Sequence, residues 1–232
     1  MGLRPALHLR SRTPSLLPGL HRALQSQQAT HGTQRRLPSQ PCHQPTGLVH
    51  LDAASGDADH GSNMERGMSA LLKSVPDWDA AATPGEFLKD VGLHIVSSVG
   101  GSSGALYGTI FLRMARAVGD APTISPGLLS DAFEAATQGV SERGKVKQGD
   151  KTMFDALAPS VQTLKAKLTE EKSLSEALRS AATAAEAGRD ATADMVARKG
   201  KSSYARENSR GFIDPGAVSV AMLIRSAART LA

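Results

Sequence analysis

The chain is 232 residues long, of which 40% are hydrophobic and 21% are charged, so one domain with a buried core is expected and global disorder is excluded. Its single cysteine, Cys42, excludes a disulfide framework and a cysteine-based metal site. The apolar runs are all shorter than the roughly 20 residues that cross a bilayer, which argues against a membrane protein. The net charge of +5 arises in residues 1–51, which hold six arginines and no acidic residue. The remainder is close to neutral and carries no pattern typical of nucleic-acid binding.

Residues 1–48 differ in composition from the rest of the chain. They contain six of the twelve prolines and no aromatic residue. A basic, serine-rich and acid-free segment is typical of an organellar transit peptide, and equally of a disordered extension, and both interpretations stay open. Within it, leucines at helical spacing between Leu16 and Gln28 allow one short amphipathic helix. We therefore divide the chain into an atypical basic tail, residues 1–48, and a domain over residues 49–232.

The domain is predicted to be all-α. Apolar residues recur at helical spacing, and helix-start patterns occur at Thr83, Ser125, Ser173 and Asp214. Together they predict about seven helices, over residues 64–75, 84–99, 105–118, 126–140, from 151 past 164, 174–199, and from 215 onward. Patterns typical of strands are scarce. Helices joined by short connections indicate a helical bundle or barrel.

Three carboxylates lie close together near the start of the domain. Asp52, Asp57 and Asp59 fall within eight residues and are followed by the polar run His60–Asn63. Like charges so close repel each other unless a cation lies between them, and Mg²⁺ prefers oxygen ligands of this kind. The alternative is a solvated turn with a helix cap, since aspartate and glycine are common in turns.

Two further segments are rich in glycine. Val99–Gly104 has serines among glycines, which let backbone N–H groups approach an anion, although a flexible linker has the same composition. Gly144–Thr152 resembles a phosphate-binding P-loop, but Asp150 precedes the lysine and no strand comes before it. We therefore reject the P-loop interpretation.

A basic cluster, Arg198–Tyr204, precedes the sequence Asp214–Gly216. It is predicted at the end of a helix, where cations commonly compensate the helix dipole, and it could equally neutralise phosphate. Asp214 is predicted to cap the last helix. All these segments lie at predicted helix ends, and alternate helix ends lie together in an up-and-down bundle. Carboxylates, glycine-serine segments and a basic cluster then predict one nucleotide-phosphate site.

In this order, the same segments resemble the DhaL family, the nucleotide-binding L subunits of dihydroxyacetone kinase. The motifs are Gly56–Asn63 preceded by Asp52, Val99–Gly104, Gly149–Met153, Ala197–Tyr204 and Asp214–Ala217. The resemblance runs from about residue 50 to the C-terminus. It implies an all-α antiparallel barrel of eight helices. Residues 1–48 do not resemble the family's first helix, so either Leu16–Gln28 replaces that helix or the barrel is open.

The resemblance also implies a set of ligands. Asp52, Asp57 and Asp59 would hold two Mg²⁺ ions, and the nucleotide would be ADP or ATP. The residues that would bind the nucleotide are His60, Gly61, Ser62, Asn63, Ser102, Ser103, Gly144, Met153, Lys201, Asp214, Pro215 and Gly216. Lys201 stands where many members have arginine; it keeps the charge but loses the two-pronged donor. Phosphoryl transfer would then need positioning and charge neutralisation, with no nucleophile from this chain.

Partners follow from the same resemblance. A separate K subunit would hold dihydroxyacetone, and an M subunit, a phosphocarrier, would rephosphorylate bound ADP at the expense of phosphoenolpyruvate; other members use ATP directly. The alternatives are a non-catalytic nucleotide-binding regulatory subunit, or an inactive member with a foreign N-terminus. We expect a cytoplasmic location, with no nucleic-acid or membrane partner.

Overall fold

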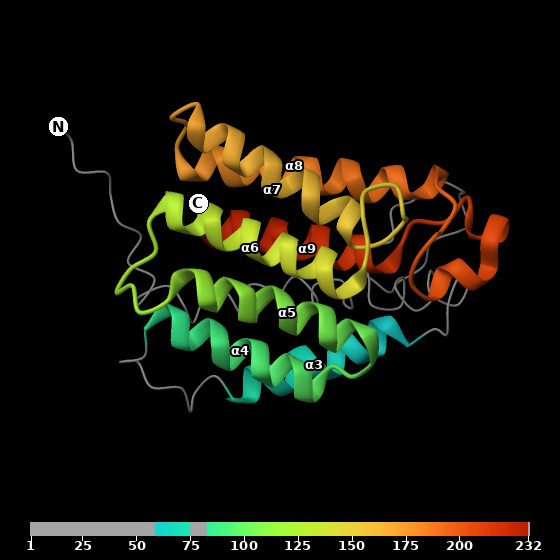
Figure 1. The fold of residues 1–232 in the computed structure, drawn as a ribbon, viewed down its shortest axis with the longest axis horizontal. Coiled ribbons are helices and arrows are strands. Elements are labelled where there is room, and N and C mark those ends of the chain that lie inside the picture. The colour runs from blue at the N-terminus through green and yellow to red at the C-terminus, as the bar shows by residue number, and fades with distance from the viewer. Residues whose placement is uncertain (1–58, 75–82, 232) are drawn as a thin grey trace, which may run out of the picture.

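The computed structural model describes residues 59–74 and 83–231, and within them the chain is helical (Figure 1). Seven α-helices occur in these residues, and none of them forms a β-strand, which confirms the all-α prediction. The helices are α3 (His60–Ser74), α4 (Pro84–Ser98), α5 (Gly101–Val118), α6 (Pro126–Gly144), α7 (Phe154–Thr169), α8 (Leu174–Ala191) and α9 (Pro215–Thr230). Two 3₁₀ segments, η3 (Thr192–Asp194) and η4 (Lys201–Ser209), separate α8 from α9.

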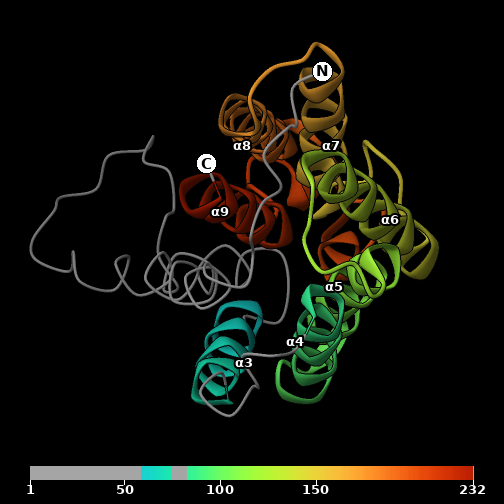
Figure 2. The same cartoon turned by 90° about the vertical axis from the view of Figure 1, so that its left-hand side faces the viewer.

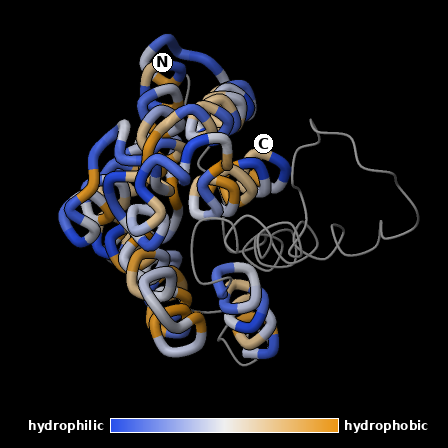
Figure 3. The backbone as a smooth tube through the Cα atoms, turned by 90° about the vertical axis from the view of Figure 1, so that its right-hand side faces the viewer, coloured by the Kyte–Doolittle hydropathy of each residue, from blue (hydrophilic) through white to orange (hydrophobic). Residues whose placement is uncertain are grey.

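The helices pack in chain order around a shared core. Each one contacts the next, and α9 also contacts α7 and α3, so the helices surround the core as Figure 2 shows in end view. The connections from α4 through α8 are short, so these consecutive helices run antiparallel. Figure 3 shows apolar and polar residues alternating along the helices, as amphipathic helices require. The largest fully buried aliphatic side chains are Leu71, Val91, Ile95, Val99, Ile110, Ile124, Leu157, Leu164 and Leu178.

The predicted helix starts are confirmed where capping side chains were recognised. The Thr83 hydroxyl accepts a hydrogen bond from the Glu86 N–H at 3.2 Å, and the Glu86 carboxylate accepts from the Thr83 N–H at 2.8 Å, which completes a capping box. Ser125 and Ser173 accept corresponding bonds at α6 and α8. These bonds satisfy N–H groups that have no partner within the helix.

Several helix boundaries differ from the sequence prediction. Helix α3 begins at His60 and not at Met64, α6 continues to Gly144 and not only to Val140, and α7 begins at Phe154 and not at Lys151.

We expected helix α5 to start at Ala105, but it begins at Gly101, because Gly100 and Gly101 both adopt φ of +61° and turn the chain tightly into the helix. Ser102 and Ser103 therefore lie in its first turn and not in an interhelical loop.

Helix α8 is shorter than predicted. We expected it to reach Lys199, but it ends at Ala191. At this point the Thr192 hydroxyl donates to the Arg189 carbonyl at 2.6 Å and accepts from the Asp214 N–H at 2.9 Å. The Thr192 side chain thus ties the end of α8 to the start of α9. The basic cluster after it belongs to an irregular segment, so compensation of the α8 dipole does not explain that cluster.

Among the described helices, none is both long enough and apolar enough to span a bilayer.

Candidate functional site

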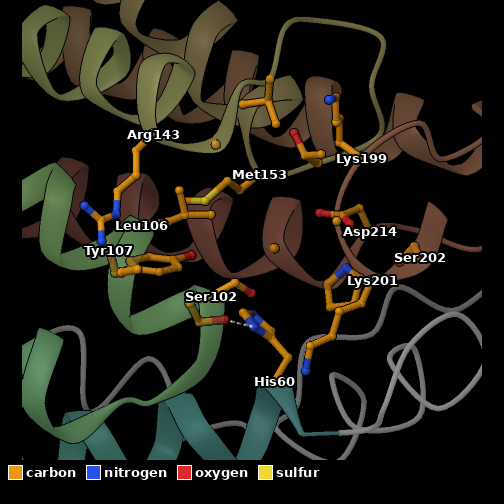
Figure 4. A pocket seen from close by; sticks show the side chains of 18 of the residues that line it. His60, Ser102, Leu106, Tyr107, Arg143, Met153, Lys199, Lys201, Ser202 and Asp214 are labelled. Atoms are coloured by element: carbon orange, nitrogen blue, oxygen red, sulfur yellow. Dashed lines mark hydrogen bonds between the residues drawn. The ribbon is translucent and has the colours of Figure 1, made fainter. Parts of the chain in front are cut away.

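A cavity of about 310 Å³ opens at the end of the bundle where the first turns of α3, α5 and α9 meet (Figure 4). The end of α6, the residue before α7 and the segment leading into η4 complete its wall. Helix N-termini carry exposed N–H groups and partial positive charge, so this end of the bundle favours an anion. The convergence of alternate helix ends is the arrangement predicted for an up-and-down bundle.

Most of the predicted site residues line this cavity: Asp59, His60, Ser102, Ser103, Gly144, Met153, Lys201, Asp214, Pro215 and Gly216. Three others do not. Gly61, Ser62 and Asn63 lie in the first turn of α3, where the Ser62 hydroxyl donates to the Asp59 carbonyl and Asn63 accepts from Arg66. Asp52 and Asp57 lie outside the described residues.

One part of the cavity is apolar, and sequence reasoning missed it. Leu106, Tyr107 and Val146 line it together with the predicted Met153. Leu106 and Tyr107 follow Ser103 by three and four residues, so they share its helix face. That spacing would have found them if the start of α5 had been placed at Gly101. Flat hydrophobic ligand groups are bound by surfaces of this kind.

Another part of the cavity is cationic. Figure 4 shows Lys199 and Lys201 near Asp214, and Arg143 beside Leu106 and Tyr107. Of these basic residues, Lys201 alone is predicted from the sequence to bind the nucleotide, and Lys199 belongs to the same predicted basic cluster, Arg198–Tyr204.

Lys201 is paired with an acidic neighbour. Its Nζ lies 3.4 Å from both carboxylate oxygens of Asp59, and the two side chains are 40% and 45% exposed. An ion pair this long and this exposed is weak. The Lys201 ammonium can therefore exchange Asp59 for a more highly charged anion at little cost in free energy.

Asp214 is occupied by its role in the fold. Its carboxylate accepts a hydrogen bond from the Ala217 N–H at 2.7 Å, so it caps α9, as predicted. If Gly216 were replaced by a residue with a side chain, the new Cβ would lie 3.2 Å from the Met153 Cβ. Close packing of Met153 on the first turn of α9 therefore shapes this side of the cavity.

His60 is held between two hydroxyl groups. Its Nδ1 lies 2.9 Å from the Ser103 Oγ, and its Nε2 lies 3.0 Å from the Ser219 Oγ. The Tyr107 hydroxyl lies 2.6 Å from the same Ser219 oxygen. These bonds connect α3, α5 and α9 directly beside the cavity.

Lys151, the lysine of the rejected P-loop resemblance, does not line the cavity. Its side chain is 1% exposed, and its ammonium donates to the carbonyls of Thr192 at 2.7 Å, Met195 at 3.1 Å and Phe212 at 2.6 Å. Burial lowers the pKa of Lys151. The lysine therefore joins the segment before α7 to the segment between α8 and α9, and both segments line the cavity.

Only part of the predicted metal site can be located. Within residues 59–74 and 83–231, no three His, Cys, Asp or Glu side chains are grouped as a metal site would require. Asp59 is the one member of the predicted trio that the structure describes, and it lies on the cavity wall. Its carboxylate is the type of ligand that Mg²⁺ prefers.

Comparison with protein-family models identifies a family for this chain. Residues 54–229 match the family model described as the DAK2 domain. The chain is also 41% identical over 178 residues to the ADP-binding subunit DhaL of the PEP-dependent dihydroxyacetone kinase of Escherichia coli (strain K12). That alignment covers 77% of this chain and 84% of the relative.

Comparison with solved structures identifies the same fold. The native dihydroxyacetone kinase of C. freundii is similar with a TM-score of 0.65 at 21% identity, over 95% of this chain and 34% of that one. The same enzyme in complex with AMP-PNP and Mg²⁺ gives a TM-score of 0.61 at 21% identity, over 99% and 35%. This chain thus spans about a third of that enzyme's chain.

Proposed function

The chain belongs to the DAK2-domain family, and we propose that it is the nucleotide-binding subunit of a dihydroxyacetone kinase. The proposal follows a relative that is 41% identical and is named as an ADP-binding subunit of such a kinase. In this role the chain binds ADP or ATP with Mg²⁺ and contributes to phosphoryl transfer to dihydroxyacetone.

The observation that carries the proposal is the division of the cavity into an apolar and a cationic part. Leu106, Val146 and Met153 offer an apolar surface for a base, whereas Lys201 and the first turn of α5 offer positive charge for phosphates. A volume of about 310 Å³ lies at the lower end of the range for small-ligand sites. A nucleotide has this same division into an apolar base and a charged phosphate tail.

We assign two Mg²⁺ ions to Asp52, Asp57 and Asp59. When bound, Mg²⁺ neutralises phosphate charge and lowers the cost of bringing anionic groups together. The carboxylate of Asp59 would then serve as a ligand of such an ion in place of its contact with Lys201, and the Lys201 ammonium would contact a phosphate oxygen. The Ser102 hydroxyl and the backbone N–H groups of Ser102 and Ser103, in the first turn of α5, would contact the same phosphates.

The acceptor comes from a partner. A K subunit presents dihydroxyacetone, and the hydroxyl oxygen of this substrate forms the new bond to phosphorus while the bond to the nucleotide breaks. We propose that ADP stays bound and is rephosphorylated by an M-type phosphocarrier, since the Escherichia coli relative is named PEP-dependent. A cytoplasmic location stays a prediction from the sequence.

The first experiment is calorimetry with ADP in the presence and absence of Mg²⁺. We expect saturable binding that Mg²⁺ strengthens, and a roughly tenfold weaker affinity, ~1.4 kcal/mol, for Lys201→Ala. Lys165→Ala is the matched control, because Lys165 is also an exposed lysine paired with a carboxylate, Glu134, and lies outside the cavity. Equal effects of the two substitutions would contradict the assignment of Lys201.

The second experiment separates catalysis from binding alone. The chain is combined with a K subunit and dihydroxyacetone, and either ATP or phosphoenolpyruvate with the phosphocarrier proteins is supplied. Product formed only with phosphoenolpyruvate supports the ADP-cofactor form of the proposal, and product formed from ATP alone overturns that form. Nucleotide binding without product under both conditions would identify a regulatory subunit.

A further inference from the structure

A continuous set of polar groups, most of them buried, borders the cavity. It runs from Ser103 on α5 through His60 on α3 to Ser219 on α9, and Tyr107 on α5 joins it at Ser219. His60 is 8% exposed, Ser219 4% and Tyr107 1%. Ser219 does not line the cavity, so it can affect a ligand only through the residues that do.

The Ser219 hydroxyl has one proton and several possible partners. Its oxygen lies 3.0 Å from the Gly216 carbonyl and 3.2 Å from the Pro215 carbonyl, both in the preceding turn of α9. Carbonyl oxygens only accept, so the hydroxyl proton points toward them. The lone pairs of the Ser219 oxygen are then left to accept hydrogen bonds.

Two groups are placed to donate to that oxygen. The Tyr107 hydroxyl lies 2.6 Å from the Ser219 oxygen and donates to it, because the Ser219 proton is directed toward the carbonyls; burial raises the pKa of Tyr107, so its hydroxyl keeps its proton. The His60 Nε2 at 3.0 Å must donate as well, since the Ser219 proton is already directed elsewhere. A neutral imidazole with its proton on Nε2 has an acceptor at Nδ1, which receives the Ser103 hydroxyl proton.

We propose that Ser219 is a positioning residue for the nucleotide: it holds His60 in its Nε2–H form, with Nδ1 facing Ser103, while Tyr107 helps to hold the Ser219 hydroxyl in place. The bonds fix the first turn of α3 and the first turn of α5 relative to α9. Since His60 and Ser103 both line the cavity, the position of the proton on His60 also sets the direction of the Ser103 hydroxyl. This inference rests on the proposed function, because it takes the cavity as the nucleotide site.

Removal of Ser219 has a defined consequence. In Ser219→Ala the His60 Nε2 loses its acceptor, so the ring is no longer confined to one tautomer and one orientation. The Tyr107 hydroxyl loses its acceptor in the same variant and becomes a buried group without a partner. In Tyr107→Phe, by contrast, the Ser219 oxygen still accepts from His60, so the tautomer is retained.

The first test measures the tautomer without any nucleotide. In protein labelled with ¹⁵N histidine, the Nδ1 and Nε2 signals of His60 are assigned by their loss in His60→Gln. We expect the wild type and Tyr107→Phe to show the proton on Nε2, and Ser219→Ala to show a mixture. A wild-type proton on Nδ1 overturns the proposal, as does a folded Ser219→Ala with the wild-type pattern.

The second test measures affinity for ADP with Mg²⁺ by calorimetry. We expect Ser219→Ala to bind about tenfold more weakly and Tyr107→Phe about threefold more weakly. Ser226→Ala is the control, because Ser226 is 3% exposed on the same helix and its hydroxyl has no hydrogen-bond partner among the described residues. Its affinity should match the wild type. Equal affinities for Ser219→Ala and Ser226→Ala contradict the positioning role.

A third variant covers the case in which Ser219→Ala does not fold. The double variant Ser219→Ala/Tyr107→Phe removes the stranded tyrosine hydroxyl, so it should melt at a higher temperature than Ser219→Ala, and it permits both measurements. If the double variant melts no higher, Tyr107 and Ser219 are not coupled and the proposal is wrong. Failure of the wild type to bind ADP counts against the proposed function, whereas the tautomer measurement judges this inference alone.

Discussion

Two segments border the cavity and are held in very different ways. The anchored segment, residues 144–153, is tied by side chains that are themselves buried. Asp150 accepts from the Lys147 N–H at 2.9 Å, and Asp155 accepts from the N–H groups of Gly149 at 2.5 Å and Thr152 at 2.8 Å. Lys151 adds three bonds to the opposite segment.

The exposed segment, residues 199–212, is tied mainly near its end. There the buried Ser209 hydroxyl accepts from the Ala197 N–H at 2.9 Å, and the Gly211 N–H donates to the Ala193 carbonyl at 2.8 Å. Its middle projects into solvent, with the Tyr204 side chain 88% exposed. Arg206 there adopts φ 49° and ψ −126°, a conformation that favours glycine.

The contrast indicates that the two segments contribute differently to ligand binding. The anchored segment presents Met153 and Val146 in fixed positions, as a rigid apolar ligand group requires. The exposed segment presents Lys199 and Lys201. Their ammonium groups can shift with the phosphates as the position and charge of the phosphates change during transfer. Substitutions in the anchored segment should therefore lower the free energy of unfolding, whereas substitutions in the exposed segment should change it little.

The largest effect is expected at Lys151. Lys151→Met keeps the length of the side chain but leaves three buried carbonyls without their charged donor. We expect a loss of roughly 3 kcal/mol or more in the free energy of unfolding, measured by urea denaturation. Lys147→Met, an exposed lysine of the same segment, is the control and should change stability by less than about 0.5 kcal/mol. Similar losses in both variants would show that Lys151 does not anchor the segment.

A smaller loss is expected at Gly188, where α8 packs on the start of α7. A Cβ at this position would overlap the Asp155 carbonyl oxygen, and the backbone there cannot move without disturbing the anchored segment. We expect Gly188→Ala to lower the free energy of unfolding by about 2 kcal/mol, measured by thermal melting.

Gly127→Ala is the control for Gly188→Ala, because it should change the free energy of unfolding in the opposite direction. A Cβ at Gly127, in the first turn of α6, would meet no atom within 4 Å. Alanine is the better helix former, so this variant should gain up to about 1 kcal/mol. A stabilised Gly188→Ala would mean that α8 is free to shift away from α7.

The same contrast explains how much could be predicted from the sequence. The sequence predicts site residues that belong to short motifs, namely Asp59, Ser103, Lys201 and Asp214, and local capping patterns predict the starts of α4 and α9. Such features depend on residues within a few positions of each other.

What the sequence did not reveal depends on distant contacts. The end of α8 is set by Thr192 bonding to the N–H of Asp214, and the carbonyls that accept from Lys151 lie 41 to 61 residues away. Hydrophobic periodicity carries no information about pairs of residues that are distant in sequence. For this reason the sequence prediction puts the basic cluster at a helix end and does not include Leu106 and Tyr107. The overlooked residues belong to the part of the site that tertiary contacts assemble.

The smallest effect is expected at Arg206, in the exposed segment, and it has the opposite sign. Its positive φ is costly for arginine and easily adopted by glycine, so Arg206→Gly should raise the free energy of unfolding by up to about 1 kcal/mol in thermal melts. Glu207→Gly is the matched control, since this neighbour keeps helical backbone angles and should lose stability on the same substitution. If Arg206→Gly leaves the melting temperature unchanged but weakens ADP binding, Arg206 contacts the nucleotide phosphates. The exposed segment would then contribute a fixed contact in addition to the mobile charges of its lysines.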